Sequence, residues 1–204
     1  MKNSYLCKRN REVEGCGYPA AQTARKDSRS DMATTLYILR HGETEENVRH
    51  VLQGTMPGQL TPRGREQARE AARTQLARIR FDCLVASDLR RCRQTVGEIR
   101  PFLQGHPEAH FTPLLRERDW GAATGQVIDP AHPIRLPDDM ETIAHLRARA
   151  RQFLDEMEKR HGGQTVLAVS HGFFLRILQC VHYDKELKEV VPMTNAEVRR
   201  IELG

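Results

Sequence analysis

Aromatic residues and regularly spaced cysteines are both scarce in this chain of 204 residues. Aromatic side chains make up 5% of the sequence against 39% for hydrophobic residues as a whole, so aliphatic side chains must fill the core. The five cysteines are an odd number, and no two of them form a C-x-x-C pair. This pattern excludes a disulfide framework and a zinc motif, and it is typical of a protein from a reducing compartment.

Long apolar runs are also missing. No segment approaches the roughly 18–20 apolar residues that a membrane-spanning helix needs. The stretch between Lys2 and Arg9 holds no apolar run long enough for a secretory signal peptide. We therefore expect a cytoplasmic protein that has no membrane partner.

The excess of positive charge is small and unevenly placed. The formal net charge is +5, of which residues 1–31 carry +3 through seven basic and four acidic side chains. The other 173 residues therefore carry only +2. So weak an excess argues against nucleic acid as a partner. The sequence carries no indication of the oligomeric state.

Residues 1–33 are polar and lack periodic apolar positions, which predicts a flexible N-terminal extension ahead of one domain over residues 34–204. Within that domain, short apolar runs alternate with segments of helical periodicity. This alternation predicts an α/β fold with a mostly parallel sheet and helices on its faces. We expect strands at 36–39, 81–86, 110–112, 165–169 and 198–203, helices over about 62–79, 88–100, 143–161 and 173–180, and a loop over 121–137.

Two of the predicted strands are followed by the same kind of tripeptide. Arg40-His41-Gly42 comes directly after Leu36–Leu39, and Ser170-His171-Gly172 comes directly after Val166–Val169. Because the carboxyl ends of parallel strands meet at one rim of a sheet, we expect the two histidines to lie close together. A histidine beside an arginine is suited to attacking a phosphate that the arginine holds.

A third polar group follows the predicted strand 81–86. Arg90 lies in the first turn of the helix after Ser87, where backbone N–H groups favour anions. We therefore expect Arg90 and Arg40 to face the two histidines and form a pocket for a compact dianion. Arg91 and Arg93 are expected on the solvated face of that helix.

From residue 35 to residue 203 the chain resembles the histidine phosphatase superfamily, in its phosphoglycerate-mutase-like branch of small cytoplasmic phosphatases. The resemblance is carried by Arg40-His41-Gly42-Glu43-Thr44, Asn47, Gln53-Gly54, Leu60-Thr61 with Gly64 and Gln67-Ala68, Ser87-Asp88-Leu89-Arg90 with Gln94-Thr95, Leu115-Arg116-Glu117, and Ser170-His171-Gly172. It implies a three-layer α/β/α sandwich with a mostly parallel central sheet. It also implies a phosphomonoesterase that needs neither a metal nor a cofactor.

The resemblance further implies a role for each matching residue. His41 would be the nucleophile that takes the phosphoryl group, and Glu117 the general acid and base. Arg40, Arg90 and His171 would bind the non-bridging phosphate oxygens. Secondary phosphate and substrate contacts would come from Asn47, Gln53, Gly54 and Gly172.

On the residues alone, Glu43, Asp119 and Glu141 compete with Glu117 for the acid role. The chain also departs from the family pattern at Ala122-Ala123-Thr124, where an acidic residue and a Glu-Gly pair are common.

Three functions fit these motifs. The first is a phosphatase for a small phosphorylated metabolite, and the second is a phosphoglycerate mutase. Only 54 positions separate Glu117 from His171, too few for the long insertion that encloses the mutase intermediate, which favours the phosphatase. The third is a non-catalytic sensor of a phosphate ligand, which would need neither His41 nor Glu117. Sugar phosphates, phosphoglycerates, cobamide precursors and phosphohistidine proteins all stay open as substrates.

Overall fold

The computed structural model describes residues 32–129, 131 and 135–204. The predicted extension over residues 1–33 therefore lies almost wholly outside the described residues. In the described part, one five-stranded sheet has the order β3-β2-β4-β1-β5. Its strands are β1 (Thr34–Arg40), β2 (Cys83–Ser87), β3 (Ala109–Thr112), β4 (Thr165–Ser170) and β5 (Val198–Leu203). The first four strands of this order are parallel and β5 is antiparallel to β1, which confirms the mostly parallel sheet.

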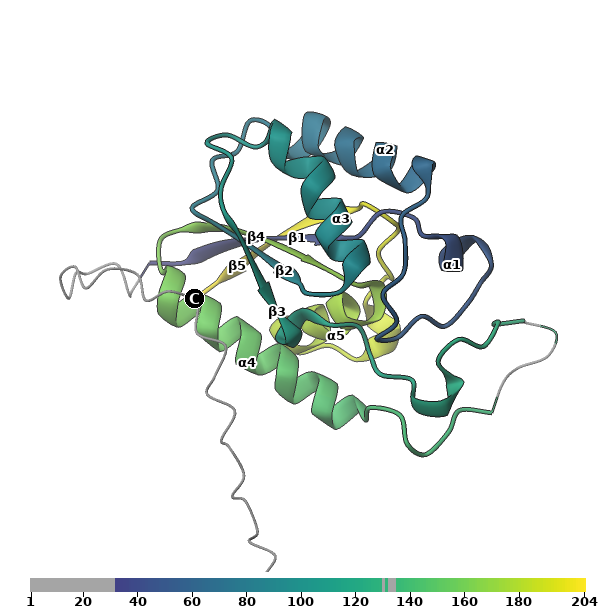
Figure 1. The fold of residues 1–204 in the computed structure, drawn as a ribbon. Helices are drawn as coiled ribbons and strands as arrows, with labels where there is room; N and C mark the ends of the chain where they lie inside the picture. The colour runs from purple at the N-terminus through teal and green to yellow at the C-terminus, as the bar shows by residue number, and fades with distance from the viewer. Residues whose placement is uncertain (1–31, 130, 132–134) are drawn as a thin grey trace, which may run out of the picture.

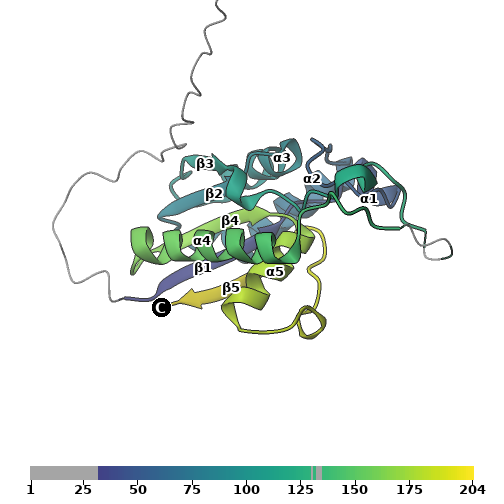
Figure 2. The ribbon, with the colours of Figure 1, turned by 90° about the horizontal axis from the view of Figure 1, so that it is seen from below.

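Helices cover both faces of the sheet (Figure 1). The covering helices are α2 (Pro62–Ala71), α3 (Arg90–Ile99), α4 (Ile143–His161) and α5 (Gly172–His182), and the short helix α1 (Glu45–Val48) follows β1 without packing on either face. Helices α2 and α3 pack on one face, and α4 and α5 pack on the other, where Figure 2 shows them in front of the strands. This arrangement confirms the expected three-layer α/β/α sandwich. None of the helices in the described part of the chain is long and apolar enough to cross a membrane.

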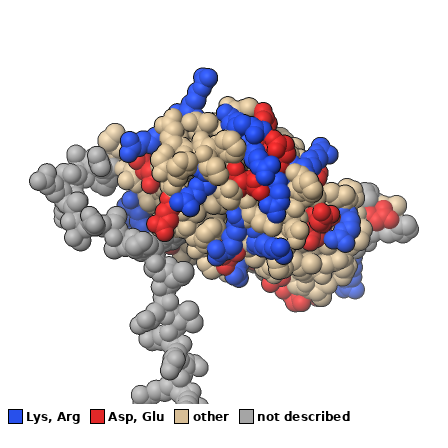
Figure 3. All heavy atoms as spheres, turned by 45° about the horizontal axis from the view of Figure 1, so that its top comes forward, with Lys and Arg blue, Asp and Glu red and all other residues tan. Residues whose placement is uncertain are grey.

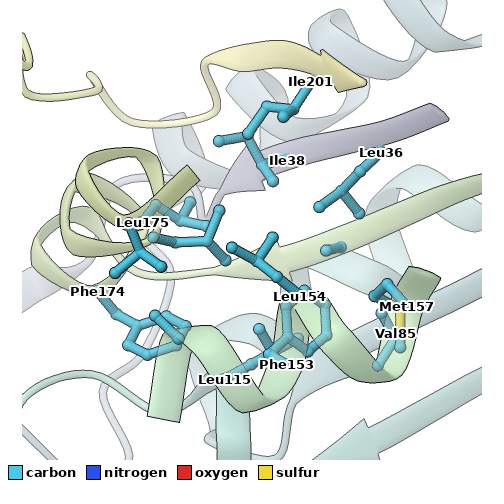
Figure 4. Close-up of a cluster of buried hydrophobic side chains, with 14 of the residues drawn as sticks. Leu36, Ile38, Val85, Leu115, Phe153, Leu154, Met157, Phe174, Leu175 and Ile201 are labelled. Carbon is cyan, nitrogen blue, oxygen red and sulfur yellow. The ribbon is translucent and has the colours of Figure 1, made fainter. Parts of the chain in front are cut away.

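Alternation along β1 divides the core between the two faces. Leu36 and Ile38 point toward α4 and α5, where Phe153 and Leu154 cover them (Figure 4). Leu39 points the other way and joins the cluster under α2 and α3. Successive side chains of a strand point to opposite faces, so one strand supplies both clusters. Both clusters are built mainly from aliphatic side chains, as the low aromatic content requires.

The helix predicted over 62–79 begins where the sequence indicates but changes geometry part-way. Thr61 caps it by accepting a hydrogen bond of 2.9 Å from the N–H of Gly64, and Pro62 occupies the first helical position. The α-helix ends at Ala71 and continues as a π-helical turn over Ala72–Leu76. Both end residues of that turn are fully buried.

The outer surface of α2 and α3 carries interspersed basic and acidic side chains, visible as adjoining blue and red atoms in Figure 3. Glu98 of α3 pairs with Arg65 at 2.6 Å and with Arg69 at 2.7 Å, both on α2. Charge on this face is therefore compensated locally.

Candidate active site

The two histidines that the sequence predicts together are neighbours at the carboxyl ends of β1 and β4. These strands pair in parallel, with Arg40 opposite Ser170. The N–H of His41 then donates to the carbonyl of Ser170 at 3.0 Å. The ring centroids of His41 and His171 lie 5.2 Å apart, and both side chains are nearly inaccessible to solvent. The sheet order places the end of β2 beside β4, so three strand ends meet at this site.

His41 has a defined tautomer. Its Nδ1 lies 2.8 Å from the carbonyl oxygen of Gly42. A carbonyl can only accept, so Nδ1 carries the hydrogen and Nε2 keeps its lone pair. The backbone of α2 approaches so closely here that position 42 needs glycine, because a Cβ on Gly42 would lie 2.2 Å from the carbonyl oxygen of Gly64. His41 is thus oriented with a nucleophilic nitrogen directed away from its own backbone.

Electrostatics keep His41 uncharged. Burial lowers the pKa of the His41 imidazole well below its usual value, and the positive charges of Arg91 and Arg40 lower this pKa further. Burial, followed by the charge of Arg91, likewise holds the pKa of His171 well below its usual value. Both imidazoles are therefore neutral at pH 7, the state that a nucleophilic histidine requires.

The second arginine of the site is Arg91, and the prediction that Arg90 faces the site is wrong. Arg90 is exposed, whereas the side chain of Arg91 is 1% exposed. Its Nε donates to His171 Nδ1 at 3.0 Å. Helix α3 begins at Arg90, and one further residue turns the side chain by about 100° toward the core.

Periodicity could have identified this arginine. The buried residues of α3 are Arg91, Cys92, Thr95, Val96 and Ile99. The spacing of i, i+4, i+5 and i+8 places Arg91 on the apolar stripe, and Arg90 falls on the opposite side with Arg93.

Arg91 is held by the loop before α2. Its Nη1 donates to the carbonyl of Met56 at 2.6 Å, and its Nη2 donates to the carbonyl of Gly54 at 2.8 Å. Gly54 adopts a φ of +50°, a left-handed conformation that favours glycine. Gly54, which was predicted to contact the substrate, is therefore connected to the site through its hydrogen bond with Arg91.

Arg40 lies across the start of α5. Its Nη1 donates to the carbonyl of Met193 at 2.5 Å. A Cβ on Gly172 would lie 3.0 Å from the Nε of Arg40 and 3.1 Å from its Cζ, so the guanidinium packs against a position that only glycine leaves clear. The Nε is buried and has no hydrogen-bond partner among the described residues. A bound anion could accept from it.

The carboxylate of Glu117 lies at the N-terminus of α5. Its Oε1 accepts from the N–H of Phe174 at 3.0 Å and from its neighbour Arg118 at 2.9 Å. Its Oε2 accepts from the N–H of Phe173 at 3.2 Å. The unpaired N–H groups and dipole of a helix start stabilise an acidic side chain there. Glu117 thus reaches the helix that His171 precedes.

Asn47 and Gln53, the two amide side chains predicted to contact the substrate, differ in their hydrogen bonds. Asn47 Oδ1 accepts from the N–H of Thr44 and from Asn195 Nδ2, each at 3.2 Å. Asn195, which the sequence did not single out, also donates to the carbonyl of His41 at 3.2 Å. Gln53 is 7% exposed, and its Oε1 has no hydrogen-bond partner among the described residues.

Among the other acids considered for the proton transfer, Glu43 accepts from Thr61 Oγ1 at 3.0 Å, and Glu141 pairs with Arg149 at 2.9 Å. Asp119 accepts from the N–H of Gly121 at 2.9 Å. Glu117 is the carboxylate that contacts the start of α5, directly after His171. Within the described residues, no group of three or more His, Cys, Asp or Glu side chains is arranged to hold a metal ion.

A comparison with known families decides the identity of the chain. The family described as histidine phosphatase superfamily (branch 1) matches residues 36–204. The chain belongs to the histidine phosphatase superfamily. A broad-specificity phosphatase of Saccharomyces cerevisiae is 30% identical over 80% of this chain and 76% of its own length. Phosphoserine phosphatase 1 of Hydrogenobacter thermophilus is 29% identical over 71% of this chain and 74% of its own.

Solved structures agree with this assignment. A mycobacterial glucosyl-3-phosphoglycerate phosphatase superposes with a TM-score of 0.73 at 25% identity, over 81% of this chain and 91% of its own. The chain is therefore a phosphatase of the histidine phosphatase superfamily.

Proposed function

We propose that this histidine phosphatase hydrolyses the phosphomonoester of a small metabolite, without a metal ion, through a phosphohistidine on His41. The observation that carries the proposal is the tautomer of His41. Its Nδ1 donates to the Gly42 carbonyl, so a neutral, buried imidazole presents Nε2 as a nucleophile between two guanidinium groups.

In the first step, His41 Nε2 attacks phosphorus and the bond from phosphorus to the ester oxygen breaks. The electron pair goes to the leaving oxygen, which takes a proton from the carboxyl group of Glu117. Arg40 and Arg91 surround the phosphoryl oxygens and stabilise their charge in the transition state. His171 was expected to bind those oxygens too, but both of its ring nitrogens are engaged by Arg91 and Ser87, so it orients Arg91 instead. Phosphate monoesters hydrolyse very slowly without a catalyst, and dividing the reaction into two transfers lowers each barrier.

In the second step, water attacks phosphorus and the phosphorus–nitrogen bond breaks. Glu117, now a carboxylate, takes the proton of that water, and the electron pair returns to His41 Nε2. Inorganic phosphate leaves and the starting protonation states are restored.

The space beside Glu117 supports a small leaving group. A cavity of about 380 Å³ adjoins it, with Thr55, Arg116, Asp139 and His145 among its lining residues. This volume lies at the lower end of the range of small-molecule sites, which span about 300–1,000 Å³. Two related phosphatases are named for phosphoserine and for glucosyl-3-phosphoglycerate, so these esters belong in the substrate panel.

The test is phosphate release from a panel of phosphomonoesters in EDTA, comparing the wild type with His41→Ala. We expect release that does not depend on metal and is abolished in the variant, while His182→Ala, at the far end of α5, retains it. Rapid quenching should trap a phosphoprotein that is labile to acid and stable to base, as a phosphohistidine is. Release that survives His41→Ala would refute the assigned nucleophile.

The same panel separates the two alternatives. A mutase would convert 3-phosphoglycerate to 2-phosphoglycerate with little release of phosphate. A sensor would bind phosphate esters and leave them intact, with no phosphoprotein formed.

A further inference from the structure

Glu117 stands on a segment whose backbone is held by a charged side chain from another element. The segment begins with the 3₁₀ turn Pro113–Leu115, which ends β3 and leads into Arg116 and Glu117. Carbonyl groups at the end of a helical turn have no partner within it. Two such carbonyls, of Leu114 and Arg116, accept hydrogen bonds from Arg149 Nη1 of α4 at 2.7 and 2.8 Å.

The other edge of the Arg149 guanidinium binds Glu141. Arg149 Nε donates to Glu141 Oε1 at 3.0 Å, and its Nη2 donates to Oε2 at 2.9 Å. The two side chains are 12% and 8% exposed, so this is a fork-to-fork pair with little solvent around it. One guanidinium thus connects the carbonyls before Glu117 to a buried carboxylate.

Glu141 in turn holds the backbone that follows Glu117. Its carbonyl accepts from Arg118 Nε at 2.8 Å, and its N–H donates to the carbonyl of Asp119 at 2.8 Å. The N–H of Asp119 donates to Glu141 Oε2 at 3.3 Å. Residues on both sides of Glu117 are therefore bound, directly or through Glu141, to the same arginine.

Arg149 also touches the helix that binds the Glu117 carboxylate. Its Cζ lies 4.4 Å from the ring centre of Phe174, a cation–π contact. The N–H of Phe174 is one of the donors to Glu117 Oε1. The Arg149 guanidinium therefore contacts both the backbone that carries Glu117 and Phe174, the residue whose N–H binds the Glu117 carboxylate.

We propose that Arg149, paired with Glu141, is a positioning residue that sets the location of Glu117 for proton transfer to the leaving group. This inference rests on the proposed role of Glu117 as general acid. Arg149 does not itself take or give the proton. It determines whether the carboxyl group reaches the leaving oxygen.

The test uses leaving groups that differ in their need for a proton. An alkoxide departs only when protonated, whereas para-nitrophenolate leaves without help. In Arg149→Lys, which keeps the charge and loses the fork, kcat/KM for an alkyl phosphate such as glycerol phosphate should fall by about 10- to 100-fold. For para-nitrophenyl phosphate, kcat/KM should stay within about twofold of the wild-type value, since kcat/KM reports the first transfer alone.

Arg176→Lys is the matched control. Arg176 of α5 donates to the carbonyls of Val190 and Leu187 at 2.7 and 2.5 Å, so it also holds two carbonyls of a surface segment, but no site residue lies between them. This variant should leave the ratio of kcat/KM for the two substrates unchanged. Glu141→Gln, which keeps the shape and removes the charge, should change that ratio in the same direction as Arg149→Lys, and circular dichroism checks that each variant folds.

Three results separate this inference from the proposed function. If Glu117→Gln lowers kcat/KM for the alkyl ester selectively and Arg149→Lys on that background adds nothing further, the two residues act as one unit and the inference holds. An equal loss on both substrates in Arg149→Lys, or a raised KM with an unchanged ratio, would overturn it and indicate a structural or substrate-binding role. A Glu117→Gln variant without leaving-group dependence would instead refute Glu117 as the acid.

Discussion

Arg91 Nε donates a hydrogen bond of 3.0 Å to His171 Nδ1, and this contact defines the state of both groups. A guanidinium has only donors, so Nδ1 is the unprotonated nitrogen of the imidazole. The hydrogen of His171 is then on Nε2, which lies 2.8 Å from Ser87 Oγ and donates to it. The buried cation of Arg91 and the neutral His171 are thus hydrogen-bonded to each other, and Ser87 at the end of β2 fixes the histidine.

This relationship predicts different outcomes for two adjacent arginines. Arg91→Ala should lower kcat/KM by about 100- to 1,000-fold, because it removes a preorganised donor to the phosphoryl oxygens. Arg90→Ala should change it by less than about twofold, since that side chain is exposed on the opposite side of α3. Steady-state kinetics on one aryl phosphate measures both. Comparable losses in the two variants would contradict this assignment.

Arg91→Ala leaves several buried acceptors without a donor, among them the carbonyls of Met56 and Gly54. Arg91→Lys is therefore measured beside it, because it keeps the charge at lower structural cost. It should bind phosphate better than the alanine variant and remain less active than the wild type, since an ammonium cannot replace the planar fork.

Folding should weaken in mild acid because His41 and His171 are buried in the neutral form. Burial and the charge of Arg91 hold their pKa values in the folded state well below those in the unfolded chain. Below about pH 6.5 the unfolded chain therefore binds protons that the folded protein does not, and stability falls as pH falls. Between pH 7.5 and 5.5 the two residues together should reduce the free energy of unfolding by about 3 kcal/mol.

Urea unfolding at the two pH values measures this change. His41→Asn removes one of the two groups, so about half of the acid destabilisation should disappear. His182, whose pKa is also lowered by burial, adds a contribution of the same sign to both proteins and cancels in the comparison. The same pH dependence in wild type and variant would show that His41 is not buried as a neutral imidazole.

Two helical glycines allow a test of how closely Arg40 packs. Gly172→Ala would place a methyl group 3.0 Å from Arg40 Nε, so the guanidinium must move away from the phosphate position. We expect kcat/KM to fall by about 10- to 100-fold, with little loss of stability. A Cβ added in Gly97→Ala meets no atom within 4 Å outside the backbone of its own helix α3, so this variant should leave activity unchanged and stabilise the fold by about 0.5–1 kcal/mol.

Thermal unfolding and kinetics on the two glycine variants provide the comparison. A Gly172→Ala protein with wild-type kcat/KM would mean that Arg40 tolerates displacement, and its role in holding phosphate would then be wrong.

The main features of the site follow from local patterns in the chain. The apolar runs Leu36–Leu39 and Val166–Val169 are each followed, after one further residue, by a His-Gly pair, and parallel strands bring such ends together. Alternating strand and helix periodicities are sufficient to indicate the layered fold. Glu117, by contrast, was one of four carboxylates, and only its family motif distinguished it.

The sequence alone therefore determined the class of fold, the pairing of His41 with His171 and the family, since periodicity and motif spacing are local properties. Tertiary structure decided that Arg91 and not Arg90 enters the site. The choice depends on the residue at which α3 starts and on which side of that helix packs against the sheet. It also decided the contacts of Arg149 and Asn195, which reach the site from distant segments. Contacts between residues far apart in the chain leave no periodic signal, so packing alone reveals them.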